Sequence, residues 1–244
     1  MKLKAISFNL SGKFAHFKKP DVNSHTYFTY SHIHKVALLG ILGAILGLKG
    51  YESFSRDKGI LRNNFPEFYE KLKSFKVAII PKKAYFTKKN ITFNNSVGYA
   101  SKEEGGNLIV REQWLENPEW EILVLENESN EFKELKDRLI KKEFAFIPYL
   151  GKNDHFAKID EVKEVYLEKS KKDLVCISLV KKDAITLKKI KRFGANFFYE
   201  EYLPVSLKEN FLIYEYEKKV FSSWIVESED DWFFEYEKKE VWFG

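Results

Sequence analysis

Cysteine is almost absent from this chain, which limits the chemistry open to it. The 244 residues include a single cysteine, Cys176. One cysteine cannot form a disulfide framework, and it cannot build a zinc site by itself. The apolar run 174–180 around Cys176 predicts a buried strand, so we interpret Cys176 as a core thiol rather than a nucleophile.

Long apolar runs are also lacking. The most compact one, residues 36–48, is shorter than the roughly 20 residues of a membrane-spanning helix. It also begins too late, and behind too many polar residues, for a signal peptide. We therefore expect a buried core helix in a soluble, cytoplasmic protein with no membrane partner. Apolar residues make up 44% of the chain, which is enough to form a core and fits one large domain or two small ones.

Acidic residues are scarce in the first part of the chain. Residues 1–100 contain 17 Lys and Arg but 5 Asp and Glu, whereas residues 101–244 contain 24 and 31. The net charge of +5 hides this asymmetry. Such a distribution predicts a nucleic-acid-binding face built from the first hundred residues, with a solvated basic surface as the alternative.

Hydrophobic periodicity predicts an ordered series of elements in residues 1–150. The expected series is a half-buried strand at 3–10, a helix at 33–46 capped by Thr29 or Ser31, a buried strand at 75–81, a strand at 119–125, a helix at 129–142 and a short strand at 144–147. This order predicts an α+β class, with a ferredoxin-like βαββαβ domain over residues 1–150 like that of RNA-recognition modules. Residues 151–244 are expected to form a β-rich extension packed on it.

The connection between the third and fourth of these elements, residues 82–118, is unusually long for a loop. Segments 84–87 and 107–111 are interpreted as the arms of an inserted, projecting β-hairpin with a Gly/Asn/Ser-rich tip. The alternative is a disordered loop.

Two patterns in the C-terminal part have structural interpretations. The sequence Glu-Tyr-Glu-Lys-Lys occurs at 215–219 and again at 235–239, which predicts related hairpin strands with Tyr216 and Tyr236 facing inward. The acidic run 227–231 is interpreted as a solvated turn in preference to a metal cluster, because no histidine is near it and no spacing template fits.

Several segments together resemble a known family. The opening segment 8–19 reads FNLSGKFAHFKK, and it is followed by Tyr27, the apolar segment 36–47, VREQWLENP at 110–118 and IPYLGKN at 147–153. This ordered set resembles CRISPR-associated protein 5, a Cascade subunit of the RAMP superfamily, and is most similar to type I-B members. The resemblance covers about the first 160 residues.

The resemblance implies a ferredoxin-like domain with a thumb-like hairpin, which residues 82–118 would supply. It implies binding of the 5′ handle of CRISPR RNA, capping of a filament of CRISPR-associated protein 7 backbone subunits and contact with the large subunit. Target DNA would be met through the complex. No cofactor is implied.

The candidate RNA-binding residues combine cations with sites of close backbone approach. They are Gly12, Lys13, His16, Lys18 and Lys19 in the opening motif, His32, His34 and Lys35 at the helix start, and Lys88, Lys89 and Arg111 in the insertion. Gly12 is expected to let the main chain approach RNA closely, and the helix start to attract phosphate.

A rival hypothesis is metal-independent cleavage of CRISPR repeat RNA, which type I-C relatives perform. It needs an acid, a base and a cation, for which the candidates are His16, His32, His34, Tyr51 and Lys152. The Lys-His pair of those relatives has no counterpart here, because Lys35 follows His34 in the opposite order. We therefore expect a protein that is not an enzyme. A scaffold with incidental RNA contacts is a third possibility, which salt-dependent binding would separate.

Overall fold

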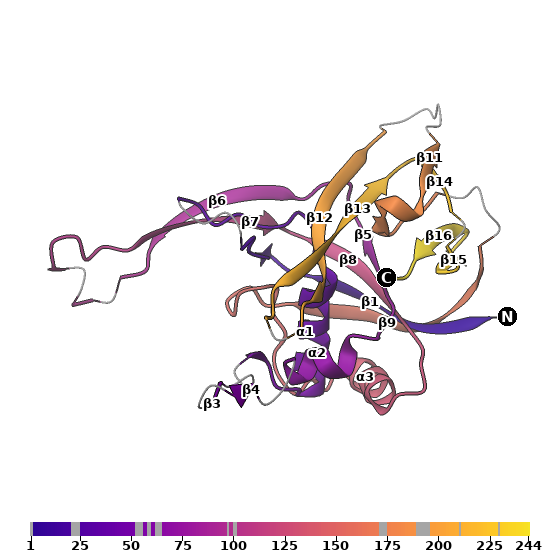
Figure 1. Cartoon of the computed structure of the whole chain (residues 1–244), viewed down its shortest axis with the longest axis horizontal. Coiled ribbons are helices and arrows are strands. Elements are labelled where there is room, and N and C mark those ends of the chain that lie inside the picture. The colour runs from indigo at the N-terminus through magenta and orange to yellow at the C-terminus, as the bar shows by residue number, and fades with distance from the viewer. Residues whose placement is uncertain are drawn as a thin grey trace.

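A six-stranded antiparallel sheet forms the centre of the molecule. The computed structural model describes residues 2–20, 25–51, 56–57, 60–61, 65–96, 98–99, 102–170, 175–188, 196–209, 211–228 and 230–244. The sheet comprises β1 (Leu3–Ser11), β5 (Val77–Pro81), β8 (Glu119–Leu125), β9 (Lys158–Lys169), β15 (Phe233–Tyr236) and β16 (Lys239–Trp242), in the order β16-β15-β9-β1-β8-β5. Its edges nearly meet, because Val77 and Gly244 exchange main-chain hydrogen bonds of 3.3 and 3.0 Å (Figure 1).

Strand β1 is buried on both faces, which corrects the expectation of a half-buried strand. Ile6, Phe8 and Leu10 pack in the core that includes the helices, whereas Ala5 packs with residues of β15 and β16. The C-terminal hairpin β15–β16 therefore covers a face that the first 150 residues would leave open. The expected domain boundary after residue 150 runs through this sheet, since β9, β15 and β16 all follow it.

In the part of the chain that the structure describes, the sheet is accompanied by the helices α1 (Lys35–Leu46), α2 (Glu67–Leu72) and α3 (Asn130–Lys141). Helix α1 contacts α2, α3 and the C-terminal strand β12 (Phe198–Leu207). It packs closely on α2, because a Cβ on Gly43 would lie 2.6 Å from the Cβ of Phe68. The residue that caps α1 is His34, whose Nδ1 accepts from the main-chain N–H of Ala37, and neither Thr29 nor Ser31 has this role. Ser129 caps α3 through the N–H of Phe132.

The short strand expected at 144–147 does not form. Strand β9 takes the place beside β1 instead, paired antiparallel from Leu3 with Leu167 to Ser11 with Lys158. Its register shifts opposite Ser7 and Asn9, where Glu161 has a φ of 52°. This irregularity interrupts the alternation of apolar and polar residues that identifies a strand in sequence.

The remaining C-terminal strands form smaller sheets beside the central one. Strands β10 (Val180–Lys181), β13 (Tyr214–Ser222) and β12 (Phe198–Leu207) form one, and β11 (Thr186–Lys188) and β14 (Ile225–Glu227) form another, with a 3-10 turn, η3, at Lys182–Ala184. Strands β3 (Arg56–Asp57) and β4 (Ile60–Leu61) form a short hairpin. Cys176 is buried, as predicted.

The two Glu-Tyr-Glu-Lys-Lys copies are not equivalent. The first lies within β13, where Tyr216 is 40% exposed, so the inward orientation predicted for Tyr216 is wrong. The second spans the turn between β15 and β16, in which Glu237 and Lys238 both have positive φ, and Tyr236 is buried as predicted. The described part of the chain has no helix both long and apolar enough to cross a membrane.

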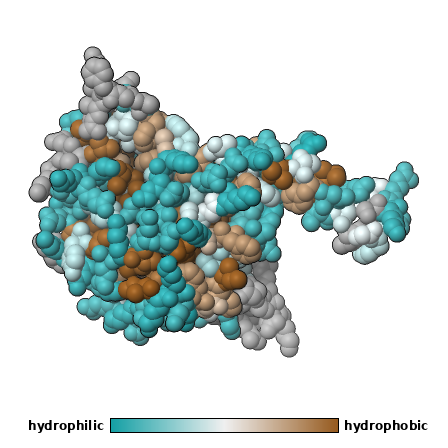
Figure 2. All heavy atoms as spheres, turned by 180° about the vertical axis from the view of Figure 1, so that it is seen from behind, coloured by the Kyte–Doolittle hydropathy of each residue, from teal (hydrophilic) through white to brown (hydrophobic). Residues whose placement is uncertain are grey.

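The predicted hairpin insertion is confirmed. Strands β6 (Thr87–Asn94) and β7 (Ile109–Glu116) pair antiparallel from Thr87 with Glu116 to Asn94 with Ile109. They project far from the rest of the molecule (Figure 1), and hydrophilic side chains dominate the outer part of the arm in Figure 2. The strands are longer than the arms expected at 84–87 and 107–111. The short strand β2 (Phe14–Ala15) pairs with the base of β7.

Candidate nucleic-acid interface

The opening motif, residues 8–19, passes between the base of the β6–β7 hairpin and the loop 148–157. The N–H of His16 donates to the carbonyl of Leu150 at 3.0 Å, and the N–H of Gly12 donates to that of Pro118 at 3.2 Å. A Cβ on Gly12 would lie 2.6 Å from Cδ1 of Leu150. The close approach predicted at Gly12 is therefore a contact with the protein's own loop, which has no room for a side chain there.

His16 is buried beside this loop. Its Nδ1 lies 2.9 Å from the carbonyl oxygen of Gln113 in β7, and a carbonyl only accepts, so Nδ1 carries the proton. Burial lowers the pKa of His16, outweighing the opposing effects of Gln113 and Glu112. His16 is thus a neutral group that joins the opening motif to the hairpin, rather than an exposed phosphate ligand.

A charged and aromatic cluster lies near His16, on the face of the hairpin that carries Glu112, Trp114 and Phe93. Nζ of Lys152 and Nε1 of Trp114 each lie 2.7 Å from Oε2 of Glu112. The ammonium of Lys152 also lies 5.0 Å from the ring centre of Phe93 and 5.4 Å from that of Trp114. Burial alone would raise the pKa of Glu112, but its hydrogen bonds to Lys152 and Trp114 lower it. This cluster fixes the hairpin to the body.

A second set of contacts, centred on Glu201 of β12, holds the segment that follows the opening motif. Its carboxylate accepts from Nζ of Lys19, from the N–H of Ser31 at 2.9 Å and from the hydroxyl of Tyr199 at 2.7 Å. Lys19 is consequently paired within the protein. No local sequence pattern singled out Glu201, since Lys19 and Ser31 lie 182 and 170 residues away in the chain.

Exposed cations surround the place where the hairpin leaves the body, and we call this set the basic collar. It consists of Lys13, Lys18, Lys88, Lys89 and Arg111, all exposed. Alternation along β6 and the register of the hairpin place Lys88 and Arg111 on one face and Lys89 on the face that carries Trp114. Nζ of Lys18 lies 3.8 Å from the ring centre of Tyr27. The main-chain N–H of Tyr27 in turn donates to the carbonyl of Arg111 in β7.

The three residues predicted at the start of α1 do not join the basic collar. His32 and His34 are 1% and 3% exposed, and burial lowers the pKa of each to about 3. Nδ1 of His32 accepts from Nε1 of Trp120 at 3.3 Å. Lys35 donates to the main-chain oxygen of Gly244 at 3.0 Å. In this conformation, His32 and His34 are neutral core residues that cannot touch RNA, which corrects their assignment.

The candidates for cleavage chemistry are dispersed. His16 and Lys152 share the cluster around Glu112, whereas His32 and His34 lie in the core and the ring of Tyr51 packs 5.6 Å from that of Phe68. Burial raises the pKa of Tyr51, which opposes a role for its phenolate.

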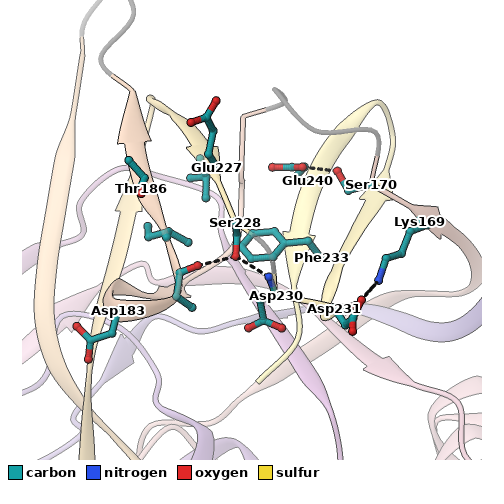
Figure 3. Close-up of a pocket in the computed structure, with 13 residues that line it drawn as sticks. Lys169, Ser170, Asp183, Thr186, Glu227, Ser228, Asp230, Asp231, Phe233 and Glu240 are labelled. Carbon is teal, nitrogen blue, oxygen red and sulfur yellow. Dashed lines mark hydrogen bonds and ion pairs between the residues drawn. The ribbon is translucent and has the colours of Figure 1, made fainter.

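One pocket lies away from the basic collar, among the C-terminal strands. It encloses about 720 Å³ between β11, β14, β15 and the end of β9. Figure 3 shows Glu227, Asp230, Asp231 and Asp183 around it, with Lys169 paired to Asp231 at 2.7 Å. Its acidic lining does not suit a nucleic acid. In the part of the chain that the structure describes, no group of His, Cys, Asp and Glu forms a metal site.

No family model matches the sequence, and no curated protein matches it. Its fold, in contrast, resembles solved structures of CRISPR proteins. A chain of a CRISPR RNA-guided surveillance complex is 14% identical, with 93% of this chain and 95% of that one covered at a TM-score of 0.53. A CRISPR protein from Archaeoglobus fulgidus is 13% identical, with 99% of both chains covered at a TM-score of 0.51.

A chain of the type III-B Cmr-beta complex bound to cognate target RNA and AMPPnP has the same TM-score of 0.51. It is 9% identical, with 90% of this chain and 85% of that one covered. At such low identities, these likenesses establish a common fold across most of the chain.

Proposed function

We propose that this chain is a cytoplasmic CRISPR RNA-binding subunit of a type I Cascade complex, of the CRISPR-associated protein 5 kind and most similar to type I-B. It binds the 5′ handle, caps the filament of CRISPR-associated protein 7 subunits and adjoins the large subunit. The order β9-β1-β8-β5, with α1 following β1 and α3 following β8, supports a ferredoxin-like core. The fold shared with a chain of a CRISPR RNA-guided surveillance complex and with a CRISPR protein supports the assignment to this system.

The single observation that carries the proposal is the basic collar at the base of a projecting hairpin. Its five cations are exposed on a protein whose C-terminal pocket is acidic. Single-stranded RNA is held by such cations on its phosphates and by aromatic rings on its bases. Tyr27, whose ring centre lies 3.8 Å from the ammonium of Lys18, offers an aromatic surface among these cations.

The absence of enzymatic activity is part of the proposal. A neutral His16 with its Nδ1–H engaged by a carbonyl, and a Lys152 paired with Glu112, are suited to holding the hairpin in place. The rival is repeat-RNA cleavage by His16 and Lys152. Labelled repeat RNA incubated with the protein in chelator decides between them, because site-specific cleavage lost in His16→Ala would establish the rival.

Charge reversal tests the RNA-binding role. The variant Lys13→Glu/Lys18→Glu/Lys88→Glu should weaken binding of handle RNA, and the slope of log affinity against log salt should fall by about 0.7 for each lost phosphate contact. The matched control, Lys73→Glu/Lys133→Glu/Lys141→Glu, has the same net charge and alters exposed lysines of α3 and the end of α2. Equal binding by the two variants would contradict the proposal.

A further inference from the structure

A second pocket, distinct from the basic collar, has a lining rich in lysine. It encloses about 400 Å³ between the start of α1, β5, the sheet of β10, β13 and β12, and the chain end after β16. A volume of this size accommodates one small molecule and excludes an extended strand. Four lysines line it against two carboxylates, namely Lys35, Lys76, Lys181 and Lys219 against Glu217 and Asp230.

The two carboxylates are already engaged. Glu217 is shared by Lys181 at 3.2 Å and Lys219 at 2.8 Å. Asp230 accepts from Nε1 of Trp242 at 3.0 Å and from the N–H of Trp232 at 2.9 Å. Lys35 donates to the main-chain oxygen of Gly244 at 3.0 Å, and among the described residues no Asp or Glu carboxylate lies within ion-pair distance of Lys76. Lysines therefore outnumber acidic side chains in the lining of the pocket.

The protein holds these like charges together at a cost. Lys219 is 7% exposed, and Lys35 is partly buried beside the N-terminus of α1, whose dipole adds positive potential. Burial first, and then the charges of Lys76 and Lys219, lower the pKa of Lys35 to about 8. An anion in the pocket would relieve this repulsion.

Aromatic rings complete the wall. Trp232 is 37% exposed, and Nζ of Lys76 lies 4.4 Å from its ring centre. Nζ of Lys219 lies 4.1 Å from the ring centre of Trp242, which is buried. Asp230 thus has a positioning role, because its two oxygens accept from the indole N–H of Trp242 and from the main-chain N–H of Trp232. In Figure 3 its carboxylate points away from the Ser170–Glu240 pair of the acidic pocket.

We infer that this pocket binds a phosphate-bearing anion of about the size of one nucleotide. The size comes from the volume, and the phosphate from the four lysines that line the pocket, because ammonium groups bind phosphate as point charges. The ligand is either a free nucleotide or the phosphorylated terminal nucleotide of a strand. The inference is independent of the RNA-binding role proposed for the basic collar.

Calorimetric titration with inorganic pyrophosphate and with adenosine monophosphate tests the pocket. The protein should bind pyrophosphate saturably, and Lys76→Glu/Lys181→Glu should weaken this binding at least about tenfold. The control Lys73→Glu/Lys133→Glu should leave it unchanged. Absence of saturable binding, or equal binding by both variants, overturns the inference.

Two further measurements keep the test decisive. If the double variant does not fold, Lys76→Gln replaces it. In the unaltered protein, pyrophosphate should shift the tryptophan fluorescence emission, and Trp232→Phe should remove this shift. If pyrophosphate binds without shifting the emission, it binds elsewhere and the inference is overturned.

Short RNAs with a 5′ phosphate, a 3′ phosphate or no terminal phosphate then identify the source of the ligand. They are titrated into the variant Lys13→Glu/Lys18→Glu/Lys88→Glu, so that the result does not depend on whether the basic collar binds RNA. Preference for one phosphorylated end assigns the pocket to a strand terminus. Equal affinity for all three, with pyrophosphate bound, assigns it to a free nucleotide.

Discussion

Gly151 lies directly against the carbonyl oxygen of His16, and a Cβ at position 151 would stand 2.0 Å from that atom. Gly151 also has a φ of 87°, which L-residues with side chains rarely adopt. The loop 148–157 therefore reaches the opening motif only because position 151 is glycine. This contact fixes the segment that carries Lys13 and Lys18 beside the base of the hairpin.

The first prediction follows from this contact. Gly151→Ala should destabilise the protein by about 2 to 4 kcal/mol, because it combines a steric clash with backbone strain. The control is Gly98→Ala near the hairpin tip, where a Cβ would meet nothing within 4 Å. It should change stability by less than about 0.5 kcal/mol. Urea denaturation measures both, and equal stabilities would contradict the packing described.

A second prediction concerns the ion pair that fixes the hairpin. A double-mutant cycle with Glu112→Gln and Lys152→Met should give a coupling energy of about 1 kcal/mol or more, since both side chains are largely shielded from water. The comparison pair is Asp137 and Lys141 on α3, whose side chains are 58% and 54% exposed. That pair should show a coupling energy of no more than about 0.5 kcal/mol. The same coupling in both cycles would mean that the cluster does not stabilise the hairpin base.

Acid sensitivity gives a third prediction. The folded-state pKa of His34 is about 3, below its ordinary value of 6.5, so between these values the unfolded chain binds more protons. Stability should therefore fall as the pH drops from 6.5 towards 3, with a slope of up to about 1.4 kcal/mol per pH unit for this histidine.

His34→Asn isolates this effect, because asparagine preserves the helix cap and does not titrate. The dependence of unfolding free energy on pH should become shallower between pH 6 and 4. Identical slopes in the two proteins would show that His34 is not a neutral core residue.

The hairpin should be separable from the fold. Replacing residues 95–108 with a two-residue turn shortens the arm but retains Phe93, Trp114 and Glu112. The thermal midpoint should change little, because the exposed outer arm buries little apolar surface. Assembly with backbone subunits should weaken, as followed by size-exclusion chromatography. A shortened protein that assembles normally would remove the outer arm from the proposed interface.

Sequence reasoning located the central strands and helices because burial gives them clear periodicity. It placed the strand at 119–125 and the helix at 129–142 to within a residue or two of β8 and α3. It missed β9, whose irregularity at Glu161 disturbs the alternation, and chose 144–147 instead. The projecting hairpin was found from its length and composition, although its strands begin and end elsewhere.

The candidate site was predictable only where function and exposure coincide. Exposed lysines of the opening motif could be proposed from charge alone. Histidine, in contrast, serves equally in a core and on a surface, and His32 and His34 pack among aromatic rings supplied by β12 and β13. Partners such as Glu201, far away in the sequence, give no local signal for Lys19.

The most direct test of the central claim is crosslinking within the assembled complex. CRISPR RNA with a photoreactive base is prepared in two forms, with the base in the 5′ handle or in the middle of the spacer. The account predicts that this subunit crosslinks to the handle, in peptides containing residues 13–19 or 88–111, and that Lys13→Glu/Lys18→Glu/Lys88→Glu reduces the yield. Crosslinks confined to the spacer, or a handle held wholly by other subunits, would contradict it.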